Sequence, residues 1–212
     1  FTTMLGADLH GSTLGILGMG RIGQAIARRG HHGFGMKVLY HNRSRLPADV
    51  EQAVGARYVG FDELLGSVDH LLLVLPYTAQ NHHIIGAAAL AKMKPTATLV
   101  NIARGGIVDE LALADALAHG RLASAALDVY ENEPDVRPEL LALRNIVLTP
   151  HVGSASLATR RAMVQVAVDN LLAGLGIGPD AGHPANAVNA GLLADGRART
   201  GNAGTKIDIK KR

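Results

Sequence analysis

A glycine-rich turn between an apolar run and a helix-like stretch is the feature that most constrains the fold of this chain. Gly18, Gly20 and Gly23 have the spacing G-x-G-x-x-G. Residues 13–17 before the turn are apolar, and residues 22–32 after it have a helical pattern. This order of strand, glycine turn and helix predicts a phosphate-binding turn at the start of a β-α-β unit.

Each glycine of the turn has a separate role in that prediction. Gly18 permits the sharp reversal, Gly20 lets a pyrophosphate approach the backbone, and Gly23 lets the helix pack closely on the strand. The N-terminus of the helix adds unpaired N–H groups and the positive end of its dipole. The motif therefore indicates a dinucleotide site, and the alternative is a purely structural glycine turn.

The chain as a whole alternates apolar runs with helix-like stretches. The apolar runs are near-continuous, as is typical of strands buried on both faces of a parallel sheet, and comprise residues 13–17, 37–40, 57–59, 70–75, 98–102, 123–129 and 146–148. The helix-like stretches comprise residues 22–32, 62–65, 87–93, 110–119, 138–143 and 157–172. We therefore predict an α/β fold with a doubly wound parallel sheet of the Rossmann type. Ser156 is the expected N-cap of the last helix, and Asp109 and Glu110 are expected to begin a helix rather than to take part in chemistry.

Near its C-terminal end the sequence becomes rich in turn-forming and small polar residues. We predict a dinucleotide-binding domain over residues 1–176 and a loosely ordered tail over residues 177–212. The last stretch comprises residues 206–212. We expect it either to form a short edge strand or to be a segment that does not belong to the natural protein.

Composition excludes several classes of function. The chain has 212 residues, no cysteine and a formal net charge of +3, so disulfide frameworks and thiol catalysis are excluded. Its basic residues are scattered, which argues against a nucleic-acid partner. The adjacent pairs His31-His32 and His82-His83 lack metal-ligand spacing, and we predict no metal site. No apolar run approaches the ~20 residues of a membrane span, and we expect a cytoplasmic protein.

The end of the second strand bears on the choice of cofactor. Domains that prefer NAD normally place Asp or Glu there to bind the adenosine ribose. This chain has Asn42 at that position, followed by Arg43, Ser44 and Arg45. Two guanidinium groups and a hydroxyl suit a 2′-phosphate through charge-assisted hydrogen bonds. We therefore predict NADP(H) in preference to NAD(H), and the alternative is a solvated basic loop.

Three later segments follow predicted strands and therefore reach the edge of the sheet where ligands bind in this fold. They are residues 101–110, residues 127–134 and residues 149–154. Together with the glycine turn, they resemble the D-2-hydroxyacid dehydrogenase family, over about residues 5–189. Within that family, residues 82–86 and 91–95, with Arg43 and Arg45, are most similar to the glyoxylate/hydroxypyruvate reductases, a group that includes 2-ketogluconate reductases.

The resemblance implies a catalytic role for three residues. Arg104 would hold the carboxylate of a 2-keto acid and polarise its carbonyl, since a guanidinium keeps its proton and binds two oxygens. His151 would be the general acid, and Glu133 would orient its ring. The product would be a D-2-hydroxy acid. Taken singly, each residue has an ordinary alternative as a loop arginine, a surface carboxylate or a turn histidine.

The resemblance also implies a set of cofactor contacts. Arg21 and Ile22 would offer backbone N–H groups to the pyrophosphate, Ile102 and Ala103 would line the groove, and Asp128 would lie near the nicotinamide. The full expected set is Gly18, Gly20, Arg21, Ile22, Gly23, Asn42, Arg43, Ser44, Arg45, Pro76, Ile102, Ala103, Arg104, Asp128, His151 and Gly153.

Relative to the family, we expect the N-terminal substrate domain to be missing and the C-terminal return to that domain to survive only as residues 157–189. A site without that second wall is open to water, and the helix over residues 157–172 is expected to expose an apolar face. We expect a cofactor-binding fragment with weak or absent turnover, from a protein that is a homodimer at full length. The alternatives are a non-catalytic dinucleotide-binding module and a methyltransferase-like nucleotide binder, which would leave Arg43, Arg45 and His151 unexplained.

Overall fold

The structure is a computed structural model that describes residues 6–188. The chain forms two compact units, Phe1–Gly153 and Ser154–Arg212, which are described separately. The sequence-based boundary at residue 176 would add the last helix to the cofactor domain, and that boundary stays a prediction. The possible edge strand over residues 206–212 lies outside the described residues.

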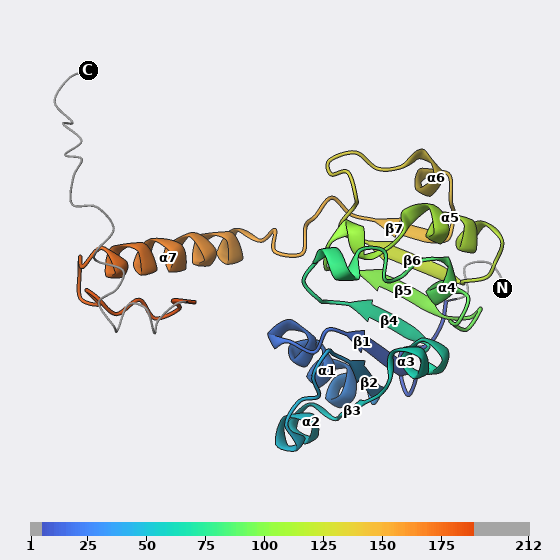
Figure 1. The fold of residues 1–212 in the computed structure, drawn as a ribbon, viewed down its shortest axis with the longest axis horizontal. Coiled ribbons are helices and arrows are strands. Elements are labelled where there is room, and N and C mark those ends of the chain that lie inside the picture. Colours follow the sequence, from blue (N-terminus) through green and yellow to red (C-terminus); the bar gives the residue numbers. More distant parts are fainter. Residues whose placement is uncertain (1–5, 189–212) are drawn as a thin grey trace. The chain divides into compact units, whose positions relative to one another are not determined.

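The first unit is built on a seven-stranded parallel sheet (Figure 1). Its strand order is β3-β2-β1-β4-β5-β6-β7, and this confirms the predicted doubly wound fold. The strands are β1 (Thr13–Leu17), β2 (Lys37–His41), β3 (Ala56–Tyr58), β4 (His70–Leu73), β5 (Thr98–Asn101), β6 (Ser124–Leu127) and β7 (Ile146–Leu148). The observed strands match the predicted runs to within one or two residues at each end.

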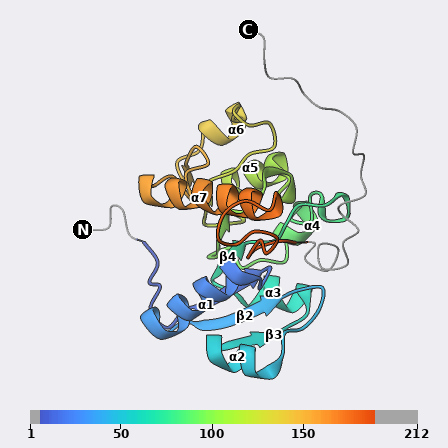
Figure 2. The ribbon, with the colours of Figure 1, turned by 90° about the vertical axis from the view of Figure 1, so that its left-hand side faces the viewer.

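Helices and short 3-10 turns connect the strands. The helices of the first unit are α1 (Arg21–Phe34), α2 (Ala48–Val54), α3 (Phe61–Ser67), α4 (Ala87–Leu90), α5 (Glu110–Ala118) and α6 (Pro138–Leu141), with 3-10 turns η1 (Ala79–Asn81) and η2 (Gly105–Ile107). Helix α2 was not predicted. Along the sheet, β2 and β3 with α1 and α2 form one half of the unit, and α4, α5 and α6 belong to the other half (Figure 2).

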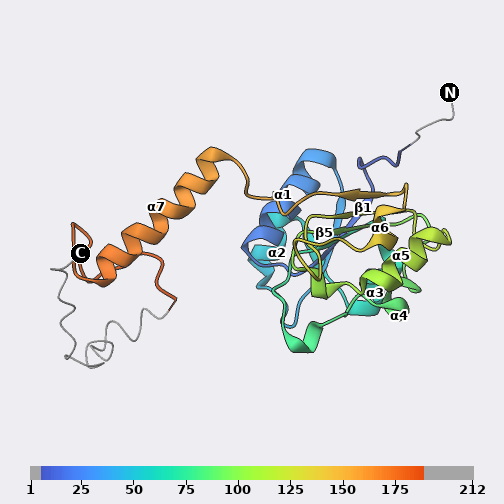
Figure 3. The ribbon, with the colours of Figure 1, turned by 90° about the horizontal axis from the view of Figure 1, so that it is seen from above.

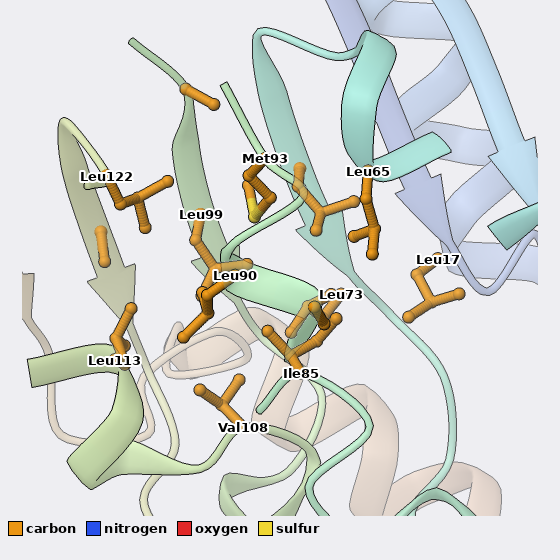
Figure 4. Close-up of a cluster of buried hydrophobic side chains, with 14 of the residues drawn as sticks. Leu17, Leu65, Leu73, Ile85, Leu90, Met93, Leu99, Val108, Leu113 and Leu122 are labelled. Carbon is orange, nitrogen blue, oxygen red and sulfur yellow. The ribbon is translucent and has the colours of Figure 1, made fainter. Parts of the chain in front are cut away.

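Two hydrophobic clusters lie on opposite faces of the sheet, because neighbouring residues of a strand point to opposite sides. On one face, Ile16 and Tyr40 pack with Ala27 of α1 and Val54 of α2. On the other face, strand leucines pack with side chains of α3, α4 and α5. Labelled members of this second cluster are Leu17, Leu65, Leu73, Ile85, Leu90, Met93, Leu99, Val108, Leu113 and Leu122 (Figure 4). The helices that cover the two faces can be followed in Figure 3.

The strand register brings the carboxyl ends of six strands into one row. Leu17 is the register partner of His41 and of Leu73. The same row continues through Asn101, Leu127 and Leu148. The segments that follow these strands, including all three segments singled out in the sequence, therefore start from a single edge of the sheet.

The second unit contains α7 (Leu157–Gly174), which is capped as predicted: the Ser156 hydroxyl accepts a hydrogen bond from Thr159 N. The turn-rich segment after it folds back on the helix end, where Gly182 N donates to the carbonyl of Ala173. Apolar side chains of α7 such as Val164, 64% exposed, are left uncovered, as expected. Within residues 6–188, no helix has the length and apolar content needed to cross a membrane.

Candidate active site at the carboxyl edge of the sheet

The glycine turn has the geometry that its spacing predicts. Gly18 has a φ of 104°, a left-handed conformation that disfavours other residues. A Cβ on Gly23 would lie 2.4 Å from the carbonyl oxygen of Gly18, so only glycine allows α1 to pack this closely on the turn. A Cβ on Gly20 would meet no protein atom within 4 Å. The turn is therefore closed where it meets the protein and open at its central residue.

The N-terminus of α1 faces this opening without a protein cap. Its N-cap is Gly20, no side chain caps it, and its first turn contains no acidic residue. Ile22 is 62% exposed there. Since a helix N-terminus leaves N–H groups unpaired and carries a positive partial charge, this end suits the pyrophosphate of a dinucleotide.

The segment after β2 is tied both to the glycine turn and to α2. The Oδ1 atom of Asn42 accepts a 2.7 Å hydrogen bond from Met19 N. Arg45 binds Glu51 of α2 through Nε and NH2 at 2.9 and 2.8 Å, and Tyr40 donates to the same carboxylate at 2.7 Å. Hydrogen bonds from Arg45 and then Tyr40 lower the pKa of Glu51 to about 2. Among the described residues, no side chain forms an ion pair with Arg43.

The turn after β5 presents Arg104. The buried side chain of Asn101 shapes this turn, accepting from Ala103 N and donating to the carbonyl of Arg104, each at 3.0 Å. Arg104 itself is exposed, and its NH1 donates to the Ala103 carbonyl at 2.6 Å. No carboxylate in the described part of the chain pairs with this guanidinium, so it keeps hydrogen-bond donors for an anion.

The loop after β6 brings Glu133 to His151. The Oε2 atom of Glu133 accepts a 2.8 Å hydrogen bond from Nδ1 of His151, and its Oε1 accepts from Tyr130 N at 3.0 Å. The hydrogen bond with His151 lowers the pKa of Glu133, with smaller help from Tyr130 N and from the charge of Arg104, against the effect of burial. His151 and Arg104 therefore both act on Glu133, the first through a hydrogen bond and the second through its charge.

Asp128 holds the backbone on either side of His151, which has a φ of 53°. Its carboxylate accepts hydrogen bonds from Thr149 Oγ1, Val152 N and Gly153 N at 2.6, 2.8 and 2.9 Å. Burial opposes ionisation of Asp128, but these hydrogen bonds outweigh it and lower the pKa of the carboxyl group. Asp128 therefore fixes the loop that presents His151, a structural role that the sequence did not reveal.

A cleft of about 1200 Å³ connects the helix N-terminus to the three residues expected to be catalytic. Residues expected at the site that line it are Ile22, Pro76, Ile102, Ala103, Arg104, Glu133 and His151. Lining residues that the sequence analysis did not assign to the site include Tyr77, His82, His83, Tyr130, Glu131 and Arg137. His82 and His83 lie within residues 82–86, which carry part of the family resemblance, so the sequence held a signal for this part of the wall.

The cleft and the glycine turn define a dinucleotide-binding domain with an Arg, a Glu and a His at its edge. Residues 2–153 match the family described as D-isomer specific 2-hydroxyacid dehydrogenase, NAD binding domain. The chain belongs to this family, and the resemblance seen in the sequence is confirmed.

Individual relatives are similar over about four fifths of the chain. Glyoxylate/hydroxypyruvate reductase B of Pectobacterium atrosepticum is 52% identical over 171 residues, which cover 80% of this chain and 53% of that protein. A crystal structure of a glyoxylate reductase from Paecilomyes thermophila superposes with a TM-score of 0.78 at 48% identity, covering 82% of this chain and 52% of that one. An NADPH-dependent glyoxylate/hydroxypyruvate reductase from Sinorhizobium meliloti, crystallised with NADP and malonate, gives a TM-score of 0.72 at 42% identity, with 78% and 50% coverage. The chain thus spans about half the length of the relatives it matches.

Proposed function

We propose that this chain provides the cofactor domain and the catalytic residues of an NADP(H)-dependent reductase. Its substrate would be a small 2-keto acid of the glyoxylate, hydroxypyruvate or 2-ketogluconate type, and its product a D-2-hydroxy acid. The observation that carries the proposal is the 2.8 Å hydrogen bond between Glu133 and His151, which lies on the same cleft as Arg104 and the start of α1.

Arg104 suits the role of substrate anchor. A guanidinium remains protonated at every working pH and offers its donors as a planar fork. Because Arg104 is exposed and spends one donor on the carbonyl of Ala103, the others are available to the carboxylate and carbonyl oxygens of a 2-keto acid.

His151 suits the role of proton donor. A carboxylate only accepts hydrogen bonds, so the contact with Glu133 places a proton on Nδ1 of His151 and directs the Nε2 atom to the substrate. His151 would then protonate the carbonyl oxygen from Nε2 in reduction, and would accept the proton at the same atom in the reverse direction.

The residues present fit a nicotinamide dinucleotide. Its pyrophosphate would lie at Gly20 and the first N–H groups of α1, where the backbone is open and uncapped. When bound, the dinucleotide supplies the hydride for the reduction. The preference for NADP(H) rests on Arg43, Ser44 and Arg45, and on the NADPH-dependent relative crystallised with NADP. Since Glu51 neutralises much of the charge of Arg45, Arg43 carries most of the proposed preference.

A non-catalytic or truncated dinucleotide-binding module is the second candidate. It is supported by the glycine turn and the uncapped N-terminus of α1, which suit a dinucleotide whether or not catalysis follows. We also propose a cytoplasmic location and a homodimer for the full-length protein. The absence of cysteine is compatible with the first, and sedimentation of a full-length protein would test the second.

The proposal is tested by following nicotinamide absorbance while the chain is mixed with NADPH and glyoxylate or hydroxypyruvate, with NADH as the control cofactor. Faster oxidation of NADPH than of NADH, with D-glycerate as the product from hydroxypyruvate, would support it. Binding of NADPH without turnover would favour the non-catalytic module, and turnover with NADH alone would contradict the cofactor assignment.

A further inference from the structure

A buried carboxylate that the proposed chemistry does not use lies behind the catalytic loops. Glu110 is 2% exposed, although it is the first residue of α5. Its Oε1 atom accepts a 2.7 Å hydrogen bond from Glu131 N, and its Oε2 atom lies 3.3 Å from Nε of Arg137. Burying a carboxylate costs free energy unless the group has such partners. The role of Glu110 therefore depends on what these contacts hold in place.

Of the two contacts that Glu110 makes, only the one with Glu131 N is a hydrogen bond. The Nε atom of Arg137 is buried without a hydrogen-bond partner in the described part of the chain, so its contact with Glu110 is an ion pair rather than a hydrogen bond. Arg137 also pairs with Oε2 of Glu131 at 2.8 Å, and His83 binds Oε1 of the same carboxylate. Glu110 is therefore the acceptor that fixes the backbone of this loop.

The Tyr130–Glu131 peptide is held by two residues that follow Arg104 in the chain. A Cβ on Gly105 would lie 1.9 Å from the carbonyl carbon of Tyr130 and 2.3 Å from Glu131 N, so the Arg104 turn packs directly on this peptide. Glu110, in the same segment, accepts from its N–H group. The loop after β6 is thus held by packing and by a hydrogen bond against the segment that contains Arg104.

The loop after β6 in turn orients Glu133 against His151. Tyr130 N donates to Oε1 of Glu133 at 3.0 Å, while Oε2 of Glu133 accepts from His151 at 2.8 Å. The hydroxyl of Tyr130 donates to the carbonyls of Leu127 and Thr149, so it links the loop to the ends of β6 and β7. A displacement of the Tyr130–Glu131 peptide would move the carboxylate of Glu133 relative to His151 and Arg104.

We propose that Glu110 is a positioning residue: through its hydrogen bond to Glu131 N it fixes the turn from Tyr130 to Glu133, and so sets Glu133 against His151 and Arg104. The inference rests on the proposed function for the catalytic role of that pair. The claim that Glu110 controls the contact between Glu133 and His151 can be tested without measuring turnover.

The test is an NMR titration of the Glu133 carboxyl group in chain labelled with ¹³C-glutamate, with Glu133→Gln used to assign the signal. In the wild-type chain the hydrogen bond with His151 holds the pKa of Glu133 below its ordinary range. Glu110→Ala is expected to raise the pKa of Glu133 toward that range. If the chain turns over a keto acid, the same variant is expected to lower kcat about 100-fold with little change in KM, since misplaced catalytic groups cost about that much.

Two further variants separate positioning from stability. Glu110→Asp keeps the charge for Arg137 but withdraws the oxygen from Glu131 N, and is expected to raise the pKa of Glu133 even if Glu110→Ala does not fold. Glu110→Gln keeps an acceptor oxygen and is expected to preserve the pKa. Glu51→Ala removes the other buried carboxylate of the described residues, and is expected to lower stability without moving the pKa of Glu133. An unchanged pKa of Glu133 in folded Glu110→Ala and Glu110→Asp would overturn the proposal, whereas absence of turnover in the wild-type chain would count against the proposed function alone.

Discussion

The side-chain oxygen of Asn42 lies 2.7 Å from the amide nitrogen of Met19 and accepts its hydrogen bond. This contact joins the end of β2 to the middle of the glycine turn, at the position where an NAD-preferring domain carries a carboxylate. An aspartate at residue 42 would accept the same hydrogen bond with nearly the same shape. The two side chains therefore differ here mainly in charge.

Asn42→Asp is expected to weaken NADPH binding about tenfold or more and to leave NADH binding unchanged or improved. The added carboxylate would repel a 2′-phosphate and would accept from the ribose hydroxyls of NAD(H). Fluorescence titration with both cofactors measures the effect. Equal changes in the two dissociation constants would show that Asn42 does not face the 2′ position.

Two glycines of the turn provide a matched pair of substitutions. Gly20→Ala is expected to leave the melting temperature within a few degrees of the wild-type value but to abolish dinucleotide binding, because its Cβ would meet no protein atom within 4 Å and would occupy the phosphate approach. Gly23→Ala is expected to destabilise the fold itself, since its Cβ would lie 2.4 Å from the Gly18 carbonyl oxygen. Thermal unfolding and cofactor titration of both variants separate the effects. Normal cofactor binding by Gly20→Ala would contradict the placement of the pyrophosphate.

His151→Gln is expected to lower kcat by about 100-fold to 10,000-fold, the range typical of general acid catalysis, with the affinity for NADPH nearly intact. Glutamine keeps a hydrogen-bond donor for Glu133 but holds no transferable proton near neutral pH. Stopped-flow turnover and an equilibrium titration on the same preparation give both quantities. Retained turnover would remove His151 from the mechanism.

The Tyr40–Glu51–Arg45 cluster predicts two limits to the pH range of stability. Because hydrogen bonds from Arg45 and Tyr40 lower the pKa of Glu51 from 4.5 to about 2, its contribution is present above pH 4.5 and is lost as the pH falls through about 2. Burial and then the bond to Glu51 raise the pKa of Tyr40 from 10 to about 12, so its contribution is present below pH 10 and is lost as the pH rises through about 12.

Single substitutions resolve the two limits. In denaturant unfolding measured across pH, Glu51→Gln is expected to flatten the acid limb, and Tyr40→Phe to flatten the alkaline limb at a cost of about 1–3 kcal/mol at neutral pH. An acid limb of unchanged slope in Glu51→Gln would show that other carboxylates dominate acid unfolding.

The sequence was sufficient for the parts of the fold that depend on local pattern. All seven strands of the sheet were predicted, since buried parallel strands are continuous apolar runs. Helix α2 (Ala48–Val54) was missed because its buried residues are Glu51 and Val54, so a charged side chain interrupts the apolar period that marks an amphipathic helix. It matters for function because it carries Glu51, which binds Arg45.

Contacts between distant loops could not be read from spacing. The sequence motifs pointed to Arg104, Glu133 and His151, and the strand register brings them to one cleft. Glu110 was read as the start of a helix, which it is, but its bond to Glu131 joins residues 21 positions apart. Such a pair appears only once the loops after β5 and β6 are placed side by side.

The central claim is that the chain holds NADP(H) beside its catalytic residues, and equilibrium titration of the wild-type chain and of Arg43→Ala/Arg45→Ala with NADPH and NADH tests it most directly. We expect the wild-type chain to bind NADPH more tightly, and the double variant to lose about 1.5–3 kcal/mol of NADPH affinity, the value of a hydrogen bond to a charged group, with NADH affinity little changed. Equal loss for both cofactors, or tighter binding of NADH by the wild-type chain, would contradict the account.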